Sequence, residues 1–145
     1  MQESQTTHSW IEKYSVPFGR IALFVIFFWF GLLKVLSLSP ANPLVAELEA
    51  KTLPFISFDT FILLFGLFEM LIGVLFLIPK ATRLVFILFI LHMITTFLPL
   101  VCLPEVTWQK PFVPTLEGQY IIKNLALISV AFFLLINHSK NHAHA

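Results

Sequence analysis

Ionisable and polar side chains interrupt otherwise apolar stretches of this sequence. Glu69 and His92 each lie near the middle of such a stretch, Lys34 lies toward the end of another, and Lys123 and Asn124 are adjacent in a fourth. A charged group in the middle of a bilayer costs about 2.5–3.5 kcal/mol on insertion scales, so such a residue faces the protein interior and finds a partner there. These five residues are therefore the candidate ligand-binding or ion-pair residues.

Several kinds of chemistry are open to these residues. Glu69 could form an interhelical ion pair with a lysine, or could bind a ligand or a proton. His92 could relay protons, bind a metal, or hydrogen-bond a neighbouring helix or the nearby Thr95 and Thr96. No second His or Cys stands at ligand spacing, so the sequence predicts no intramembrane metal site. Lys123 could equally extend its ammonium group toward the membrane interface.

The elements that must position these residues are four long apolar segments, at about residues 17–36, 60–78, 83–100 and 118–137. A helix needs roughly 20 apolar residues to cross the hydrocarbon core of a bilayer. The segments are too long, and alternate too little, to be strands of a barrel. The sequence therefore predicts an all-α, integral membrane four-helix bundle, with residues 1–145 forming a single transmembrane domain.

Composition supports a lipid environment. The chain has 145 residues, of which 58% are hydrophobic and 12% charged, with a mean hydropathy of +0.89. Soluble domains average about 45–50% apolar and about 25% charged residues. The formal net charge of +1 and the scattered basic residues give no indication of nucleic-acid binding. Cys102 is the single cysteine, which excludes an internal disulfide and a CxxC redox pair.

Basic residues in the short connections predict the orientation, because cytoplasmic loops are enriched in Lys and Arg. One side would carry five basic residues and the other side two; the five are Lys13, Arg20, Lys80, Arg83 and Lys140, and the two are Lys51 and Lys110. Both termini are therefore predicted to be cytoplasmic, with the first and third loops outside.

The tail histidines, His138, His142 and His144, could bind a metal weakly, but a solvated C terminus is the preferred interpretation.

The first outer loop is predicted to contain a short amphipathic helix. Asn42 is the expected N-cap, with Pro43 at the first helical position and the helix running to about Lys51. Apolar residues would lie on one face and the two glutamates, Glu47 and Glu49, on another. The third loop is rich in proline and aromatic residues and is predicted to be an ordered lid over the outer end of the bundle.

Glycine spacing predicts which helices lie close together. Gly66, Glu69 and Gly73 follow each other at i, i+3 and i+7, which places them on one face of a helix. Gly31 and Lys34 share a similar face of the first helix. Small residues let membrane helices approach closely, so Gly31, Gly66 and Gly73 are the predicted helix-packing residues. This packing would bring Lys34 near Glu69.

Three stretches of the sequence resemble the DoxX superfamily. GLFEMLIGVLFLIPKATRL (Gly66–Leu84) resembles a helix of that superfamily with a GxxE…G pattern and a short basic cytoplasmic turn, and KNLALISVAFFLLI (Lys123–Ile136) looks like its last helix. FWFGLLK (Phe28–Lys34) and PANPLVAEL (Pro40–Leu48) are similar to the YkgB-like branch, which is associated with resistance to reactive chlorine. The resemblance spans about Arg20–Ile136.

The resemblance implies a protein of the bacterial inner (cytoplasmic) membrane that takes part in the oxidative-stress response. Namesakes of the superfamily are linked to a thiosulfate:quinone oxidoreductase, in which the redox centre depends on partner subunits. This sequence has no flavin, haem or iron–sulfur motif, so no cofactor is evident. The resemblance leaves a quinone or a lipid as the candidate bound molecule, and other membrane subunits or a second copy of this chain as candidate partners.

Three functions remain open on the sequence. The preferred one is a membrane subunit or anchor of a larger complex that is redox- or quinone-linked. The second is a small transporter or permeability protein whose Lys34, Glu69 and Lys123 handle an anion or a proton. The third is a stand-alone enzyme on a lipid-soluble substrate, with Glu69 and His92 as acid and base. The chain is more readily understood as a subunit than as an enzyme on its own.

Overall fold

The computed structural model confirms an all-α membrane architecture. It describes the backbone of residues 2–143 and the side chains of residues 10, 11 and 13–140. Four of its helices are long and apolar enough to cross a membrane, along Lys13–Val35, Phe58–Phe76, Pro79–Cys102 and Leu116–Lys140. The helices that contain these stretches are α1 (Gln2–Val35), α3 (Phe58–Phe76), α4 (Thr82–Phe97, with α5, Pro99–Cys102, following it) and α7 (Leu116–Ala143).

Two helices extend beyond the segments predicted from hydropathy. Helix α1 begins at Gln2 rather than near residue 17, so Pro17 lies inside it and removes one backbone N–H from the helix. Helix α7 continues to Ala143 rather than ending near residue 137. Polar residues can continue a helix past the hydrocarbon layer, and a hydropathy window does not detect those turns.

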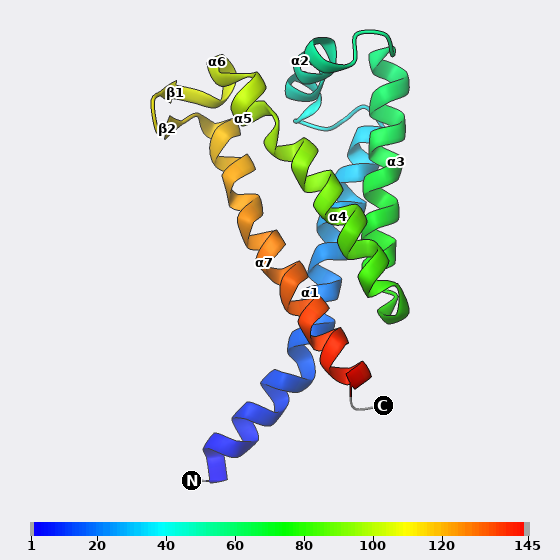
Figure 1. Ribbon diagram of the computed structural model, residues 1–145, viewed down its shortest axis with the longest axis vertical. Helices are drawn as coiled ribbons and strands as arrows, with labels where there is room; N and C mark the ends of the chain where they lie inside the picture. Colours follow the sequence, from blue (N-terminus) through cyan, green and yellow to red (C-terminus); the bar gives the residue numbers. More distant parts are fainter. Residues whose placement is uncertain (1, 144–145) are drawn as a thin grey trace.

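The four long helices form an uneven bundle (Figure 1). Helices α1 and α3 run side by side, and α4 packs along α3. Helix α7 crosses α1 near the ends of the chain, packs against α4, and diverges from α1 and α3 further along. Both termini lie at one end of the bundle, which we call the terminal end. The other end carries α2, α5, α6 and a hairpin, and we call it the loop end.

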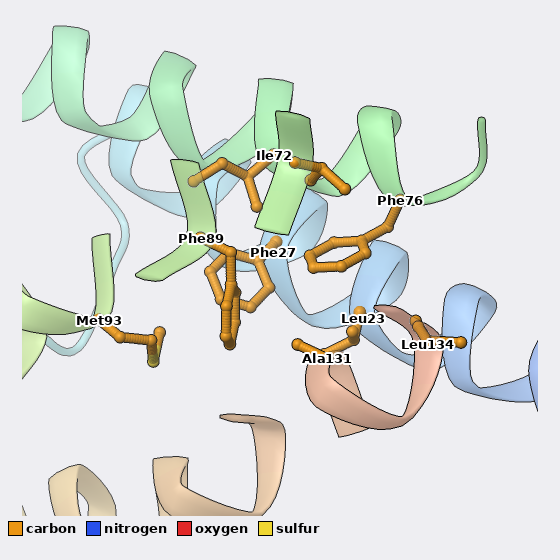
Figure 2. Close-up of a cluster of buried hydrophobic side chains, with 9 residues drawn as sticks. Leu23, Phe27, Ile72, Phe76, Phe89, Met93, Ala131 and Leu134 are labelled. Atoms are coloured by element: carbon orange, nitrogen blue, oxygen red, sulfur yellow. The ribbon is translucent and has the colours of Figure 1, made fainter. Parts of the chain in front are cut away.

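A cluster of buried apolar side chains joins all four helices (Figure 2). Its members are Leu23, Phe27, Ile72, Phe76, Val85, Phe89, Met93, Ala131 and Leu134. Phe89 is central to it, because its ring lies 5.5 Å from that of Phe27 and 5.6 Å from that of Phe76, both in edge-to-face geometry. Such aromatic pairs contribute about 0.5–1.5 kcal/mol beyond the area they bury. Dispersion contacts of this kind hold membrane helices together, since lipid is as apolar as the side chains.

Glycines set the separation of α1 and α3. A Cβ atom built on Gly31 would lie 2.6 Å from the Gly66 carbonyl oxygen, and one built on Gly66 would lie 2.7 Å from the Gly31 oxygen. A Cβ atom on Gly73 would lie 2.8 Å from the Phe28 nitrogen. The two backbones therefore touch at Gly31, Gly66 and Gly73, and no larger residue fits at these points without separating the helices.

The loop end is built from short elements. They are α2 (Asn42–Thr52), α6 (Pro104–Thr107), and the strands β1 (Trp108–Lys110) and β2 (Val113–Pro114); the 3-10 turn η1 (Pro79–Ala81) connects α3 and α4 at the opposite end. Lys51 of α2 forms an ion pair of 2.7 Å with Glu105 of α6 and donates a hydrogen bond of 3.1 Å to the Cys102 carbonyl. The hydrogen bond from Lys51 holds the pKa of the exposed Glu105 below its ordinary value.

Helix α2 differs in two respects from its prediction. Ala41 occupies the N-cap and Asn42 is already helical, because the Ser39 hydroxyl accepts a hydrogen bond from the Ala41 N–H and tightens the preceding turn. Glu49 was placed with Glu47 on the polar face, yet Glu49 is buried and Glu47 is exposed. Because α2 contacts both α3 and α5, more of its surface is covered than one apolar stripe would indicate.

The third loop is ordered, as predicted, but its hairpin does not cover the bundle. Strands β1 and β2 pair antiparallel, with Trp108 opposite Pro114 and Lys110 opposite Val113. Figure 1 shows the hairpin at the edge of the loop end, beside the end of α7 and away from α2 and α3. The sequence did not predict these strands, because two- and three-residue strands carry no detectable alternation.

We expect Gly31→Ala to destabilise the protein, lowering the free energy of unfolding by about 1–3 kcal/mol, because the new methyl group would overlap the α3 backbone. Gly19→Ala is the matched control on the same helix. A Cβ atom on Gly19 would lie 3.3 Å from a methyl of Val130, a side chain that can adjust. Thermal unfolding in detergent measures the stability of both variants. Equal melting temperatures for Gly31→Ala and Gly19→Ala would contradict the close approach of α1 and α3.

Candidate functional site

The contact between α1 and α3 brings Lys34 and Glu69 together. Lys34 lies one turn after Gly31 on α1, and Glu69 lies one turn after Gly66 on α3. The two helices run antiparallel, and their close approach at the glycines lets the long Lys34 side chain reach back along α3 to Glu69. The Lys34 Nζ atom is 2.6 Å from Glu69 Oε2, and each side chain is 7% exposed. The ammonium also lies 5.6 Å from the centre of the Phe65 ring, a cation–π distance. The two residues form a buried, charge-assisted hydrogen bond.

His92 of α4 extends this contact to a third helix. Its Nε2 atom is 3.2 Å from Glu69 Oε1 and 3.3 Å from the Thr96 hydroxyl. The hydroxyls of Thr95 and Thr96 both donate to the His92 carbonyl, at 2.7 and 3.1 Å. Because a carboxylate only accepts hydrogen bonds, the geometry assigns a proton to Nε2. We call Lys34, Glu69 and His92 the Glu69 network.

Aromatic rings enclose the imidazole of His92. The ring centre of Phe65 lies 5.1 Å away, that of Phe27 5.4 Å, and that of Phe68 6.2 Å. His92 is 3% exposed, and its Nδ1 atom is buried without a hydrogen-bond partner among the described residues. Nδ1 is therefore an unsatisfied polar atom among the described residues. Such an atom costs free energy in the native state, which singles it out within the network.

The Glu69 network is a closed unit of three side chains. One ammonium balances one carboxylate, and the His92 imidazole donates from Nε2 to the second carboxylate oxygen. A proton can pass along this hydrogen bond only when Nδ1 also carries one, because an imidazole that lost its single proton from Nε2 would become an anion. Lys34, Glu69 and His92 are buried, and none of them lines the groove at Ile90 or the hollow at Lys110 that are described below. The arrangement of the network therefore ties α1, α3 and α4 together without exposing a reactive group to a substrate.

Lys123 and Asn124 lie apart from the Glu69 network. Lys123 is exposed on α7, and its Nζ atom lies 5.1 Å from the centre of the Tyr120 ring. No acidic residue pairs with Lys123 within the part of the chain that the structure describes. Asn124 is half-buried on the same helix. Among the described residues, the partners of Glu69 are Lys34 and His92, so neither Lys123 nor Asn124 takes part in the network.

Arg20 forms a second polar site that the sequence analysis did not identify. It is buried near the terminal end and donates to the Phe76 carbonyl at 2.9 Å and to the Thr82 hydroxyl at 2.6 Å. Thr82 in turn donates to the Pro79 carbonyl at 2.7 Å. Arg20 thus joins α1 to the turn between α3 and α4. The available signal is its position inside an apolar segment, whereas the sequence analysis uses Arg20 only as one of the five basic residues that predict the orientation.

No group of His, Cys, Asp and Glu residues that could hold a metal ion occurs among the described residues. His138 of the tail is described and has an interaction partner. The side chains of His142 and His144 lie outside the described residues, so the tail hypothesis stays a prediction.

An apolar groove runs between α4 and α7. Its volume is about 350 Å³, and it is lined by Ile90, Met93, Ile94, Phe97, Leu98, Val101 and Ile128. Five of these residues belong to α4 and α5, Leu98 lies between those two helices, and Ile128 belongs to α7. The groove occurs where α7 diverges from α1 and α3. We call it the α4–α7 groove.

Comparisons with models of protein families, with curated proteins and with solved structures find no match to this chain.

We expect Glu69→Gln to lower the free energy of unfolding by about 3–5 kcal/mol, because the charge of Lys34 would remain buried without its partner. The double variant Lys34→Met/Glu69→Gln should lose less than the sum of the two single variants. Thermal or denaturant unfolding in detergent provides the three values.

The matched control for this cycle is Glu105→Gln. It removes an ion pair of nearly the same length, 2.7 Å, whose side chains are 51% and 58% exposed. Exposed pairs contribute little to stability because water screens the charges, so this variant should unfold almost like the wild type. Strictly additive losses at Lys34 and Glu69, or a Glu69→Gln variant as stable as Glu105→Gln, would refute the buried pair.

Proposed function

We propose that this chain is a DoxX-like membrane subunit or anchor of a larger complex, and that the α4–α7 groove receives a transmembrane helix of another subunit. The α4–α7 groove is the observation that carries the proposal. The Glu69 network and Arg20 tie α1, α3 and α4 to each other, so these three helices form a fixed wall. Helix α7 contacts that wall near the terminal end and leaves it further along, which opens the groove on the lipid side.

The lining of the α4–α7 groove suits a helix. Ile90, Met93, Ile94 and Phe97 recur at i, i+3, i+4 and i+7, which forms one apolar ridge. Membrane helices pack by fitting such ridges into grooves. From Ile90 to Val101 the ridge covers eleven steps of about 1.5 Å, or about 16 Å, roughly half of a bilayer core. A partner helix would therefore contact this chain over about three turns.

A quinone or a lipid is the alternative occupant, and the DoxX resemblance is what suggests it. The side chains that line the groove are all apolar, so none of them can donate a hydrogen bond to a quinone carbonyl. The groove can accommodate the hydrocarbon chain of such a molecule but supplies nothing to orient its head group. This absence of donors favours a helix as the occupant. The same resemblance suggests that the complex is redox-linked and responds to oxidative stress.

A small transporter or permeability protein is the second candidate function. The observation that favours it is the buried His92 Nδ1 atom, which has no partner in the described part of the chain and could accept a proton. Transport would also require access to the Glu69 network from both sides, and the rings around His92 close it. For this reason the subunit function is preferred.

We further propose that the protein lies in the bacterial inner membrane with both termini in the cytoplasm. Four crossings place both ends on one side, and the terminal end carries the five basic residues counted in the sequence.

We expect Cys at Trp108, in a Cys102→Ser background, to react with a membrane-impermeant thiol reagent in intact cells. Cys at Ala81 should react only after permeabilisation. The reverse pattern would place the loop end in the cytoplasm.

We expect a photo-crosslinking amino acid at Ile94, in the α4–α7 groove, to form an adduct with one specific polypeptide in native membranes. The same amino acid at Leu64 is the control, because Leu64 is equally exposed, at 59% against 57%, but lies on α3 outside the groove. Mass spectrometry would identify the adduct, and differently tagged copies of this chain would distinguish a homo-oligomer from a different subunit.

Filling the groove tests the specificity of this adduct. Ile128→Trp should abolish it by occupying the groove from α7, whereas Phe133→Trp, on the exposed surface of α7, should leave it intact. Lipid adducts alone at Ile94, or a polypeptide adduct that survives Ile128→Trp, would contradict the proposed docking of a helix.

A further inference from the structure

The β1–β2 hairpin has a firmly attached base. The Trp108 indole N–H donates to the Leu100 carbonyl at 3.0 Å, and the Thr115 N–H donates to the Thr107 carbonyl at 2.9 Å. The Thr115 hydroxyl donates to the Val106 carbonyl at 2.7 Å. A Cβ atom on Gly118 would lie 2.2 Å from the Thr107 oxygen, so the first turn of α7 packs directly against this base. The direction in which the hairpin projects is therefore fixed by α6 and α7.

The tip of the hairpin presents an aromatic ring to the surroundings. Phe112 is 94% exposed, the highest value among the large apolar residues of the described chain. Its φ angle is +63°, in the left-handed region that Gly and Asn occupy much more readily than a bulky residue. A turn at this point would form more easily with either of those residues. The ring of Phe112 thus gains nothing from packing within the described chain, which points to a contact outside it.

A hollow beside Phe112 combines apolar walls with one positive charge. Its volume is about 480 Å³, and Pro104, Trp108, Lys110, Pro111 and Phe112 line it. Lys110 is exposed, and no acidic side chain pairs with it in the described ranges. Aromatic rings next to a lysine are the usual composition of a surface at the boundary between hydrocarbon and lipid phosphate. The charge and the walls of the hollow complement an anionic lipid head group above its acyl chains.

The hairpin also lies next to a stretch that can cross the membrane. Phe112 precedes the membrane stretch Leu116–Lys140 by four residues, so the chain keeps it within about 14 Å of the end of that stretch. The hairpin lies at the edge of the loop end, beside α7 and to the side of the other helices (Figure 1). A hairpin at this place would lie over the surrounding lipid, near its head groups.

We propose that the β1–β2 hairpin is a membrane-interface anchor, in which Phe112 inserts among the acyl chains and Lys110 binds the phosphate of an anionic lipid. This anchor would fix the height of α7 in the bilayer and the direction in which α7 leaves the other helices. The proposal depends only on the hairpin, so it stands or falls independently of the occupant of the α4–α7 groove.

A nitroxide spin label at position 112 tests the insertion. The label is attached to Phe112→Cys in a Cys102→Ser background, and the full chain is reconstituted in equimolar phosphatidylcholine–phosphatidylglycerol vesicles. The control label is at Gln109→Cys, an exposed position on the opposite side of strand β1. At each position, we compare the collision rate of the label with oxygen to its collision rate with an aqueous nickel chelate. This ratio should be at least about twofold higher at 112 than at the control, because oxygen concentrates in hydrocarbon. Equal accessibility at both positions would overturn the anchor.

Lipid-dependent stability tests the phosphate contact. Phosphatidylglycerol added to the detergent-solubilised wild type should raise its melting temperature above the value reached with phosphatidylcholine. Lys110→Gln should lose this difference, whereas Lys80→Gln, an exposed lysine at the opposite end of the bundle, should retain it. An unchanged difference in Lys110→Gln would overturn the assignment of the phosphate contact. A label at 112 that is water-accessible in vesicles but shielded in native membranes would replace the lipid with a protein partner and equally overturn the proposal.

Discussion

The buried contact between Lys34 and Glu69 is the interaction on which the arrangement of the helices depends. Two opposite charges can stay inside a membrane protein only when their atoms meet at hydrogen-bond distance and the remaining lone pairs find donors. The first condition requires α1 and α3 to touch, and Gly31 and Gly66 permit this. The second requires α4, because His92 supplies the donor for the other carboxylate oxygen. The position of three helices thus follows from satisfying one carboxylate.

Two sets of buried polar contacts, at different positions along the bundle, join α1, α3 and α4. Helix α7 takes part in neither set among the described residues. Arg20 joins α1 to the turn between α3 and α4, while the Glu69 network joins the same helices nearer the loop end. Helix α7 is held by apolar packing of Ala131 and Leu134 and by its approach to Gly19. Dispersion contacts of this kind are strong where helices touch and vanish where they separate. Among the described residues, α7 makes no buried side-chain hydrogen bond to α1, α3 or α4, and it diverges from α1 and α3 toward the loop end.

The parts of the structure that the sequence predicts are those that depend on local composition. Length and hydropathy define the four crossings, and the spacing of Gly66 and Glu69 places both on the face that meets α1. The contacts of Arg20 and the burial of Glu49 depend on what packs against them, which no local pattern reveals. The absence of Lys123 from the described Glu69 contacts has the same origin, because it depends on how α7 packs against the other helices. Strands β1 and β2 are too short for their alternation to be detected.

The enclosure of the Glu69 network bears on the choice between a structural and a proton-conducting role. A proton that leaves His92 or Glu69 needs an acceptor within hydrogen-bond distance, and the free Nδ1 atom faces the rings that surround the imidazole. Conduction would therefore require Phe27, Phe65 or Phe68 to move and admit water. Phe27 also packs against Phe89 at the centre of the core, so its displacement would disturb contacts among the helices. The same packing that makes the network a poor conductor makes it a rigid support for whatever binds beside α4.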